Sequence, residues 1–96
     1  MSVLHVDLVP KSGAESVLEE TYHGTFGPAI RQQPGFRSVT LLRPAESGSW
    51  RLDIEFERED QRVAWTETAL HQEVWGAMES QLASYQPVLF QEVTAP

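Results

Sequence analysis

The sequence predicts an α+β fold in which a four-stranded antiparallel sheet carries helices on one face. Three observations support this prediction: strand-like alternation of apolar and polar residues, helical spacing in longer segments, and turn residues between them. The expected order is strand, helix, strand, strand, helix, strand. At 96 residues the chain has room for one domain, residues 1–96.

The first half of the chain begins with a strand over residues 3–9, whose odd and even positions face opposite sides. A helix follows from about Ala14, with Ser12 as its expected cap. A kink or break is expected near Gly24, because glycine and proline disfavour a straight helix. The helix is then expected to restart over residues 28–33.

The middle of the chain reads as a hairpin of two strands. Pro34-Gly35 mark a turn that leads into the second strand, residues 36–43. A loop over residues 44–49 leads into the third strand, residues 50–57. Apolar and acidic residues alternate most clearly in that third strand.

The last part reads as helical and then extended. A second helical region begins near Glu59-Asp60, whose carboxylates favour a helix start. Thr68 is expected to cap a further helix to about Ser84, and the last strand is expected over residues 87–93. The apolar stripe of that further helix is expected to be Leu70, Val74, Met78 and Leu82.

Two βαβ-like halves joined by a hairpin indicate a ferredoxin-like βαββαβ sandwich, in which the first and third strands are neighbours. Helices cover only one face of such a sheet, and a second subunit would cover the other. The apolar residues expected on the uncovered face are Val3, Val39, Leu41 and Leu89.

Composition disfavours several classes of function. A net charge of −7 with scattered basic residues argues against nucleic acid and anionic membrane surfaces as partners. No apolar run approaches the roughly 20 residues of a membrane helix. The chain has no cysteine, and its N-terminus shows no secretion signal, so a cytoplasmic location is expected. Motifs that bind nucleotide cofactors are absent.

The segment from Trp65 to His71 carries the candidate chemistry. An imidazole has an ordinary pKa of about 6.5, which suits a general base, and an indole can hold a flat ligand. Glu67, four residues before His71, would orient the imidazole if the helix is continuous. The alternative interpretation is a core tryptophan and an exposed or capping histidine.

Two further clusters have both functional and structural interpretations. Tyr22, His23 and Phe26 form either the mouth of a pocket or an irregular helix end. His5 and Asp7, facing the acidic residues of the third strand, form either a metal site or a face paired with arginines. We favour the second interpretation and expect no metal. The arginines available for pairing are Arg37, Arg43 and Arg51.

Three short segments carry a family resemblance: Gln33-Pro34-Gly35-Phe36, then Leu52-Asp53-Ile54-Glu55-Phe56-Glu57, then residues 60–75 with Trp65, His71 and Trp75. In these segments the sequence resembles the antibiotic biosynthesis monooxygenase family of dimeric α+β-barrel proteins, over residues 3–93. The resemblance implies a homodimer whose two sheets pack into a barrel. It also implies a pocket between the sheet and the helices of each subunit.

The resemblance also implies site residues. In the polyketide oxygenases of this family, an amide, a tryptophan and a hydroxyl or imidazole line the pocket, and Gln61, Trp65 and His71 occupy those positions here. Gln61 replaces an asparagine of that subgroup, and His71 a tyrosine. The residues expected to bind substrate are Tyr22, His23, Phe26, Trp75 and Tyr85.

Haem-degrading members of the family are a poorer match. They use an asparagine on the first strand and a histidine about ten positions after the tryptophan, where this chain has Val6 or Asp7 and Trp75. No cofactor is therefore expected. Haem remains an alternative, with His71 or His23 as a ligand in another geometry.

These inferences lead to a hypothesis of function. We expect a cofactor-independent monooxygenase, an oxidoreductase acting with O2 on a small phenol, quinol or anthrone. His71 would assist loss of a phenolic proton, Trp65 would hold the ring, and Gln61 would hydrogen-bond a substrate oxygen. Two alternatives stay open: a non-catalytic dimeric binding or accessory protein, and a cyclase or isomerase using the same pocket.

Overall fold

The predicted order of strands and helices is confirmed, although each helical part is divided into shorter segments. The structure is a computed structural model and describes residues 1–93. Its elements are β1 (Ser2–Pro10), α1 (Glu15–Thr21), the π-helical turn η1 (Tyr22–Phe26), α2 (Gly27–Ile30), β2 (Phe36–Leu42), β3 (Trp50–Phe56), α3 (Glu59–Thr66), α4 (Ala69–Glu79) and β4 (Leu82–Gln91).

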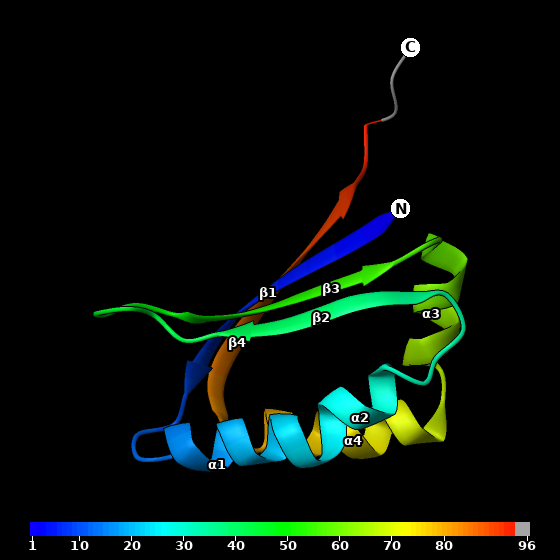
Figure 1. The fold of residues 1–96 in the computed structure, drawn as a ribbon. Coiled ribbons are helices and arrows are strands. Elements are labelled where there is room, and N and C mark those ends of the chain that lie inside the picture. Colours follow the sequence, from blue (N-terminus) through cyan, green and yellow to red (C-terminus); the bar gives the residue numbers. More distant parts are fainter. Residues whose placement is uncertain (94–96) are drawn as a thin grey trace.

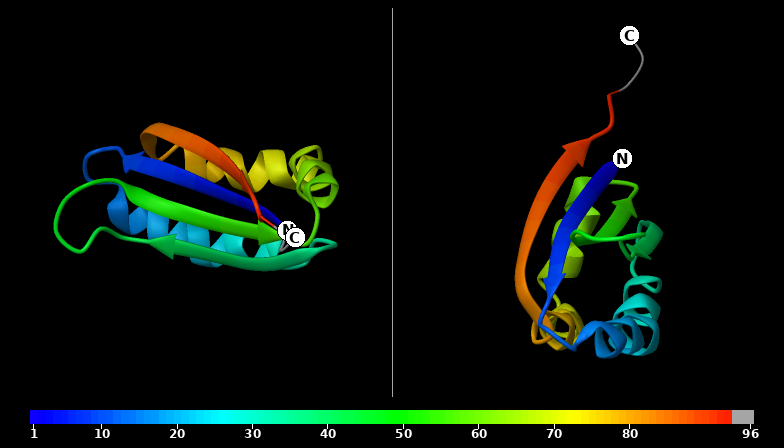
Figure 2. Two further views of the ribbon diagram at one scale, coloured as in Figure 1. Left: turned by 90° about the horizontal axis from the view of Figure 1, so that it is seen from above. Right: turned by 90° about the vertical axis from the view of Figure 1, so that its left-hand side faces the viewer.

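The four strands form one antiparallel sheet in the order β2-β3-β1-β4, as a ferredoxin-like fold requires. The helices α1, α2 and α4 lie along one face of this sheet, and α3 lies near the end of β3 (Figure 1). Figure 2 shows that α4 lies on the β1–β4 side, whereas α1 and α2 lie on the β2–β3 side. Within residues 1–93, no helix combines the length and apolar character needed to cross a membrane.

The core lies between the sheet and the helices. In β1 and β3 the even-numbered residues face the helices, and Val6 and Leu52, which pair directly, are both buried. Burial alternates along the whole of β3, because successive strand residues point to opposite faces. The helices cover this layer with Leu18, Tyr22, Phe26, Ile30, Trp65, Val74 and Met78.

The irregularity expected near Gly24 is present, but it is not a break, because the chain stays helical from Glu15 to Ile30. The helix also ends at Ile30 rather than at residue 33. The irregularity is the turn η1, closed by a hydrogen bond from the Gly27 amide to the Tyr22 carbonyl. Pro28 has no N–H to donate, and a wider turn just before a proline relieves the crowding that its ring would cause in an α-helix.

Two predicted boundaries also change. Ser12 does not cap the first helix, whose N-cap is Ala14 without a side-chain hydrogen bond. The last helix ends at Glu79 rather than Ser84, and Leu82 begins β4 instead of continuing the helical stripe. Residues after Leu82 hydrogen-bond along β1, and this ladder outweighs their helical spacing.

The faces expected for Val39, Leu41 and Leu89 are wrong, since all three lie on the helix-facing side. Directly paired residues share a face, and these three pair with Ile54, Leu52 and Leu4, respectively. In β2 the cause is a bulge between Phe36 and Ser38, which shifts the register by one residue. Val3 does lie on the open face, beside Phe90.

The turn before β2 is tied to the start of α3 through Gly35. This glycine has φ +79°, a conformation that other residues rarely adopt. A Cβ at position 35 would also collide with the end of the Gln61 side chain, which would have to move and give up its cap of α3. Gln61 Oε1 accepts a hydrogen bond of 3.1 Å from the Arg58 amide at the beginning of α3.

We expect Gly35→Ala to lower the free energy of unfolding by about 2 kcal/mol or more, because backbone strain is joined by the collision with Gln61. Gly13→Ala is the matched control, since Gly13 has φ +80° and nothing within 4 Å of an added Cβ. The control should lose only about 1 kcal/mol in urea unfolding. Equal losses in the two variants would contradict the role given to Gln61.

Candidate functional site

A cavity of about 150 Å³ lies between the helix-facing side of the sheet and the helices. Its floor comes from β1, β3 and β4, and its walls come from η1, α3 and α4. On α3 the wall residues Trp65 and Thr66 lie three and four positions after Arg62. On α4 Trp75 lies four positions after His71, so each set shares a helix face. The lining residues are Leu4, Val6, Phe26, Leu52, Ile54, Arg62, Trp65, Thr66, His71, Trp75, Tyr85 and Pro87.

Five rings form a continuous aromatic wall around this cavity. His71 stands edge-on to Trp65, with ring centroids 5.1 Å apart and an interplanar angle of 86°. Phe26 contacts both indoles, at 6.3 Å from Trp65 and 6.1 Å from Trp75. Tyr85 continues the wall at 5.2 Å from Trp75. Such edge-to-face pairs fix ring orientations, so the cavity has a defined shape.

His71 presents an unused nitrogen in this setting. Its backbone amide donates a 3.0 Å hydrogen bond to Thr68 Oγ1, which confirms Thr68 as the cap of α4. The imidazole is half-buried, and Nδ1 is buried without a hydrogen-bond partner among residues 1–93. Burial lowers the pKa of His71 below the ordinary 6.5, and the positive charge of Arg62 lowers it further. The ring is therefore neutral at pH 7 and able to accept a proton.

The expected role of Glu67 in orienting His71 is wrong. The helix is not continuous, because α3 ends at Thr66 and α4 begins at Ala69. Glu67 lies in the break with an exposed side chain. Thr68, through its cap, and Trp65, through ring contact, hold the histidine instead.

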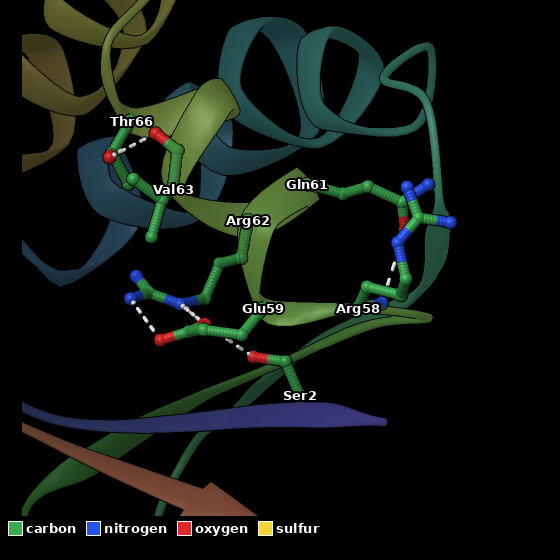
Figure 3. A network of polar contacts seen from close by, with 7 residues as sticks. All are labelled: Ser2, Arg58, Glu59, Gln61, Arg62, Val63 and Thr66. Carbon is green, nitrogen blue, oxygen red and sulfur yellow. Dashed lines mark hydrogen bonds and ion pairs between the residues drawn. The ribbon is translucent and has the colours of Figure 1, made fainter.

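Arg62 is a cavity residue that the sequence analysis missed. Its guanidinium binds Glu59 in a fork, with Nε 2.6 Å from Oε1 and Nη2 2.9 Å from Oε2. Glu59 Oε1 also accepts a 2.8 Å hydrogen bond from the Ser2 hydroxyl on β1 (Figure 3). Residues 62, 65 and 66 share one face of α3, and this spacing was the available signal.

Of the remaining predicted site residues, some line the cavity and others lie outside it. Phe26, Trp75 and Tyr85 line the cavity, as Trp65 and His71 do. Tyr22 is buried outside the lining, and its hydroxyl donates to the Val39 carbonyl at 3.3 Å. His23 is exposed on the surface beside Tyr22. Gln61 also lies outside the lining, and its side chain caps α3 instead.

On the open face of the sheet, Asp53 is paired with an arginine, so the favoured interpretation is confirmed for this one carboxylate. Arg51 Nε lies 2.8 Å from Asp53 Oδ1, and His5 lies beside both side chains. Arg43 pairs elsewhere, with Glu19 at 2.8 Å. Across the described part of the chain, no three His, Asp or Glu side chains are grouped as metal ligands.

Solved structures share this fold. A provisionally named antibiotic biosynthesis monooxygenase from Nitrosomonas europaea superposes with a TM-score of 0.82 at 19% identity, covering 98% of this chain and 100% of that one. A protein of the same provisional name from Deinococcus radiodurans superposes with a TM-score of 0.85 at 11% identity, covering 100% of this chain and 96% of that one. SnoaB, a cofactor-independent oxygenase from Streptomyces nogalater, superposes with a TM-score of 0.81 at 21% identity, covering 98% of this chain and 95% of that one. No family model and no curated protein sequence matches the chain.

We expect His71 to titrate below pH 6.5 when its ring resonances are followed by NMR, because burial and Arg62 disfavour the imidazolium. Arg62→Gln should raise this midpoint, whereas Arg37→Gln, the same charge change on an exposed strand residue, should not. Because the native pKa lies below the unfolded one, His71 should lower the stability of the fold as pH falls below 6.5. A midpoint above 6.5 would contradict this assignment.

Proposed function

We propose that the protein is a cofactor-independent monooxygenase of the antibiotic biosynthesis monooxygenase family, acting with O2 on a small aromatic compound. The observation that supports this most directly is the neutral His71, whose ring lines an aromatic cavity edge-on to Trp65 and whose Nδ1 has no hydrogen-bond partner among residues 1–93. A buried, unpaired nitrogen is unusual in a folded protein and is often functional. The shared fold with SnoaB, described as a cofactor-independent oxygenase, supports the same proposal.

The size of the cavity favours one class of substrate. An apolar cavity of about 150 Å³ is large enough to bind benzene. The cavity here has that volume, so a single-ring phenol or quinol fits it without rearrangement. An anthrone has three fused rings and would require the aromatic wall to move. We therefore propose a monocyclic phenol or quinol as the preferred substrate.

The proposed chemistry begins with a proton transfer. His71 accepts the phenolic proton, and the resulting phenolate passes one electron to O2, which gives a phenoxyl radical and superoxide. These combine to form a carbon–oxygen bond on the ring, and the proton held by His71 returns to the peroxide. Loss of water then leaves one oxygen atom of O2 in the quinone product and the other in the water. Trp65 holds the ring, and the surrounding apolar residues exclude water from the reduced oxygen species. Gln61 takes no part in the proposed chemistry, because its side chain lies outside the cavity lining and caps the start of α3.

Haem does not fit the cavity. A porphyrin is several times larger than the 150 Å³ available beside His71. His23 is exposed on the surface beside Tyr22 and does not line this cavity. The proposed reaction therefore uses no haem.

We expect purified protein to consume O2 with a substituted hydroquinone in the absence of added cofactor. His71→Ala should lower the rate by about 10²- to 10⁴-fold, which is the usual contribution of a general base. Trp65→Ala should also lower it, through weaker binding of the ring. Oxygen uptake measured with an electrode, with subtraction of the uncatalysed rate, checks this.

His23→Ala is the matched control, because it removes an exposed imidazole outside the cavity and should leave the rate unchanged. Unchanged uptake in His71→Ala would contradict the proposed mechanism. Binding that depends on Trp65 but comes without uptake would favour the accessory binding protein. Conversion of the ligand without oxygen consumption would favour a cyclase or isomerase.

We also propose that the protein is a homodimer that pairs through the open face of the sheet. Val88 and Phe90 of β4 are exposed there, although both are large and apolar. Val3 pairs directly with Phe90 and adds a third apolar side chain to this group, and clustered exposed apolar side chains are a feature of subunit interfaces. The charges of Arg51 and Asp53 on the same face are already paired with each other, so their burial costs less.

We expect wild-type protein to elute as a dimer in size-exclusion chromatography with light scattering. Phe90→Glu should shift it toward the monomer, because an unpaired carboxylate would be buried in the interface. Leu70→Glu is the control, since Leu70 is similarly exposed but lies on α4. A monomeric wild type, or a dimer unaffected by Phe90→Glu, would rule out this interface.

A further inference from the structure

We propose that Arg62 binds a negatively charged oxygen of the ligand, so that the cavity selects aromatic anions over neutral aromatic compounds of the same shape. This inference rests on the proposed function and names the charge state in which its substrate is held. The feature that carries it is a guanidinium group in the cavity wall with one nitrogen still unoccupied.

An inventory of donors identifies the unoccupied nitrogen. An arginine side chain has five N–H groups, and the fork with Glu59 uses Nε and Nη2. Nη1 has no hydrogen-bond partner among residues 1–93, and it projects away from Glu59 in Figure 3. The side chain is only 17% exposed and lines the cavity. Two N–H groups are thus available to a ligand oxygen.

The guanidinium is held in place from the side away from its free nitrogen. Glu59 stays ionised, because its hydrogen bonds to Arg62 and to Ser2 lower its pKa. The Ser2 hydroxyl belongs to the first residue of β1, so the sheet itself anchors the carboxylate. Ser2 and Glu59 are therefore positioning residues, which prevent Arg62 from turning toward solvent.

The electrostatics of the cavity single out Arg62. The other lining residues are apolar, aromatic or hydroxyl-bearing, apart from His71, which is neutral at pH 7. Hydrogen bonds from a guanidinium to an anionic oxygen are about twice as strong as neutral ones. Apolar walls strengthen the interaction further, because they lower the local dielectric constant. A phenolate formed by proton transfer to His71 would thus be stabilised.

A merely structural ion pair is the competing explanation. Arg62 and Glu59 stand three residues apart on α3 and link that helix to β1, and this would stabilise the fold without any ligand. The two explanations differ in one measurable respect. Only a ligand-binding arginine makes the protein distinguish an aromatic anion from its neutral isostere.

The test compares benzoate with benzamide by isothermal titration calorimetry at pH 7, because the two have the same ring and nearly the same shape. Wild type should bind benzoate about 10-fold more tightly, the effect of one hydrogen bond to a charged group. Arg62→Gln should bind the two compounds equally. Arg43→Gln is the matched control, since it removes an arginine that is also paired with a glutamate but lies outside the cavity, and it should keep the preference.

Equal binding of benzoate and benzamide by wild type would overturn the inference, and so would a benzoate preference that survives in Arg62→Gln. A measurement on wild type guards against misfolding of the variant. Benzoate, but not benzamide, should shift the side-chain nitrogen resonances of Arg62 in NMR spectra, and an absence of this shift would also overturn it. If the protein consumes O2 but binds benzoate and benzamide equally, only the inference about Arg62 is contradicted. If it prefers benzoate but consumes no O2, the proposed oxygenase function is contradicted and the anion site stands.

Discussion

The direct pairing of β1 with β3 is the constraint on which the rest of the structure depends. Val6 lies opposite Leu52, and both are buried, so every even-numbered residue of the two central strands faces the helices. Because the even-numbered residues face the helices, they form the apolar floor of the cavity. A slip of one residue in both strands would turn every side chain over and bring His5 and Asp53 beneath the helices instead. The aromatic wall would then stand over a charged surface.

The parts of the fold that follow from local patterns were predictable from the sequence. The alternation in β3 and the cap at Thr68 depend on residues within a few positions of each other. The face of β2 was not predictable, because a bulge near its start changes the register without a marked sequence signal. The end of α4 was not predictable either, since Leu82 fits a helical stripe and joins β4 only through its pairing with Pro10.

The residues of the candidate site were likewise only partly predictable from the sequence. Trp65 and His71 were identifiable because an indole and an imidazole six positions apart form a recognisable pair within a resemblance. The spacing of Arg62 and Trp65 could have placed Arg62 on the cavity face, but its anchoring could not be predicted, since it depends on a contact between Glu59 and Ser2, 57 positions apart in the sequence. Gln61 shows the reverse case, in which a residue at the expected position is engaged in capping its own helix. Position along a motif does not tell which way a side chain turns.

The turn η1 has a consequence for how this chain tolerates insertions and deletions. Leu18, Tyr22, Phe26 and Ile30 are all buried although they are spaced four apart, and in an α-helix each such step advances about 40° beyond a full turn. The wider turn absorbs much of this drift and acts as one inserted residue. Deletion of one residue within it would restore a regular helix and keep its two halves in phase, because Leu18 and Phe26 would then stand seven positions apart, within about 20° of two full turns. We therefore expect this turn to tolerate the loss of one residue, whereas a deletion elsewhere in the helix would rotate the buried residues on one side of it by about 100°.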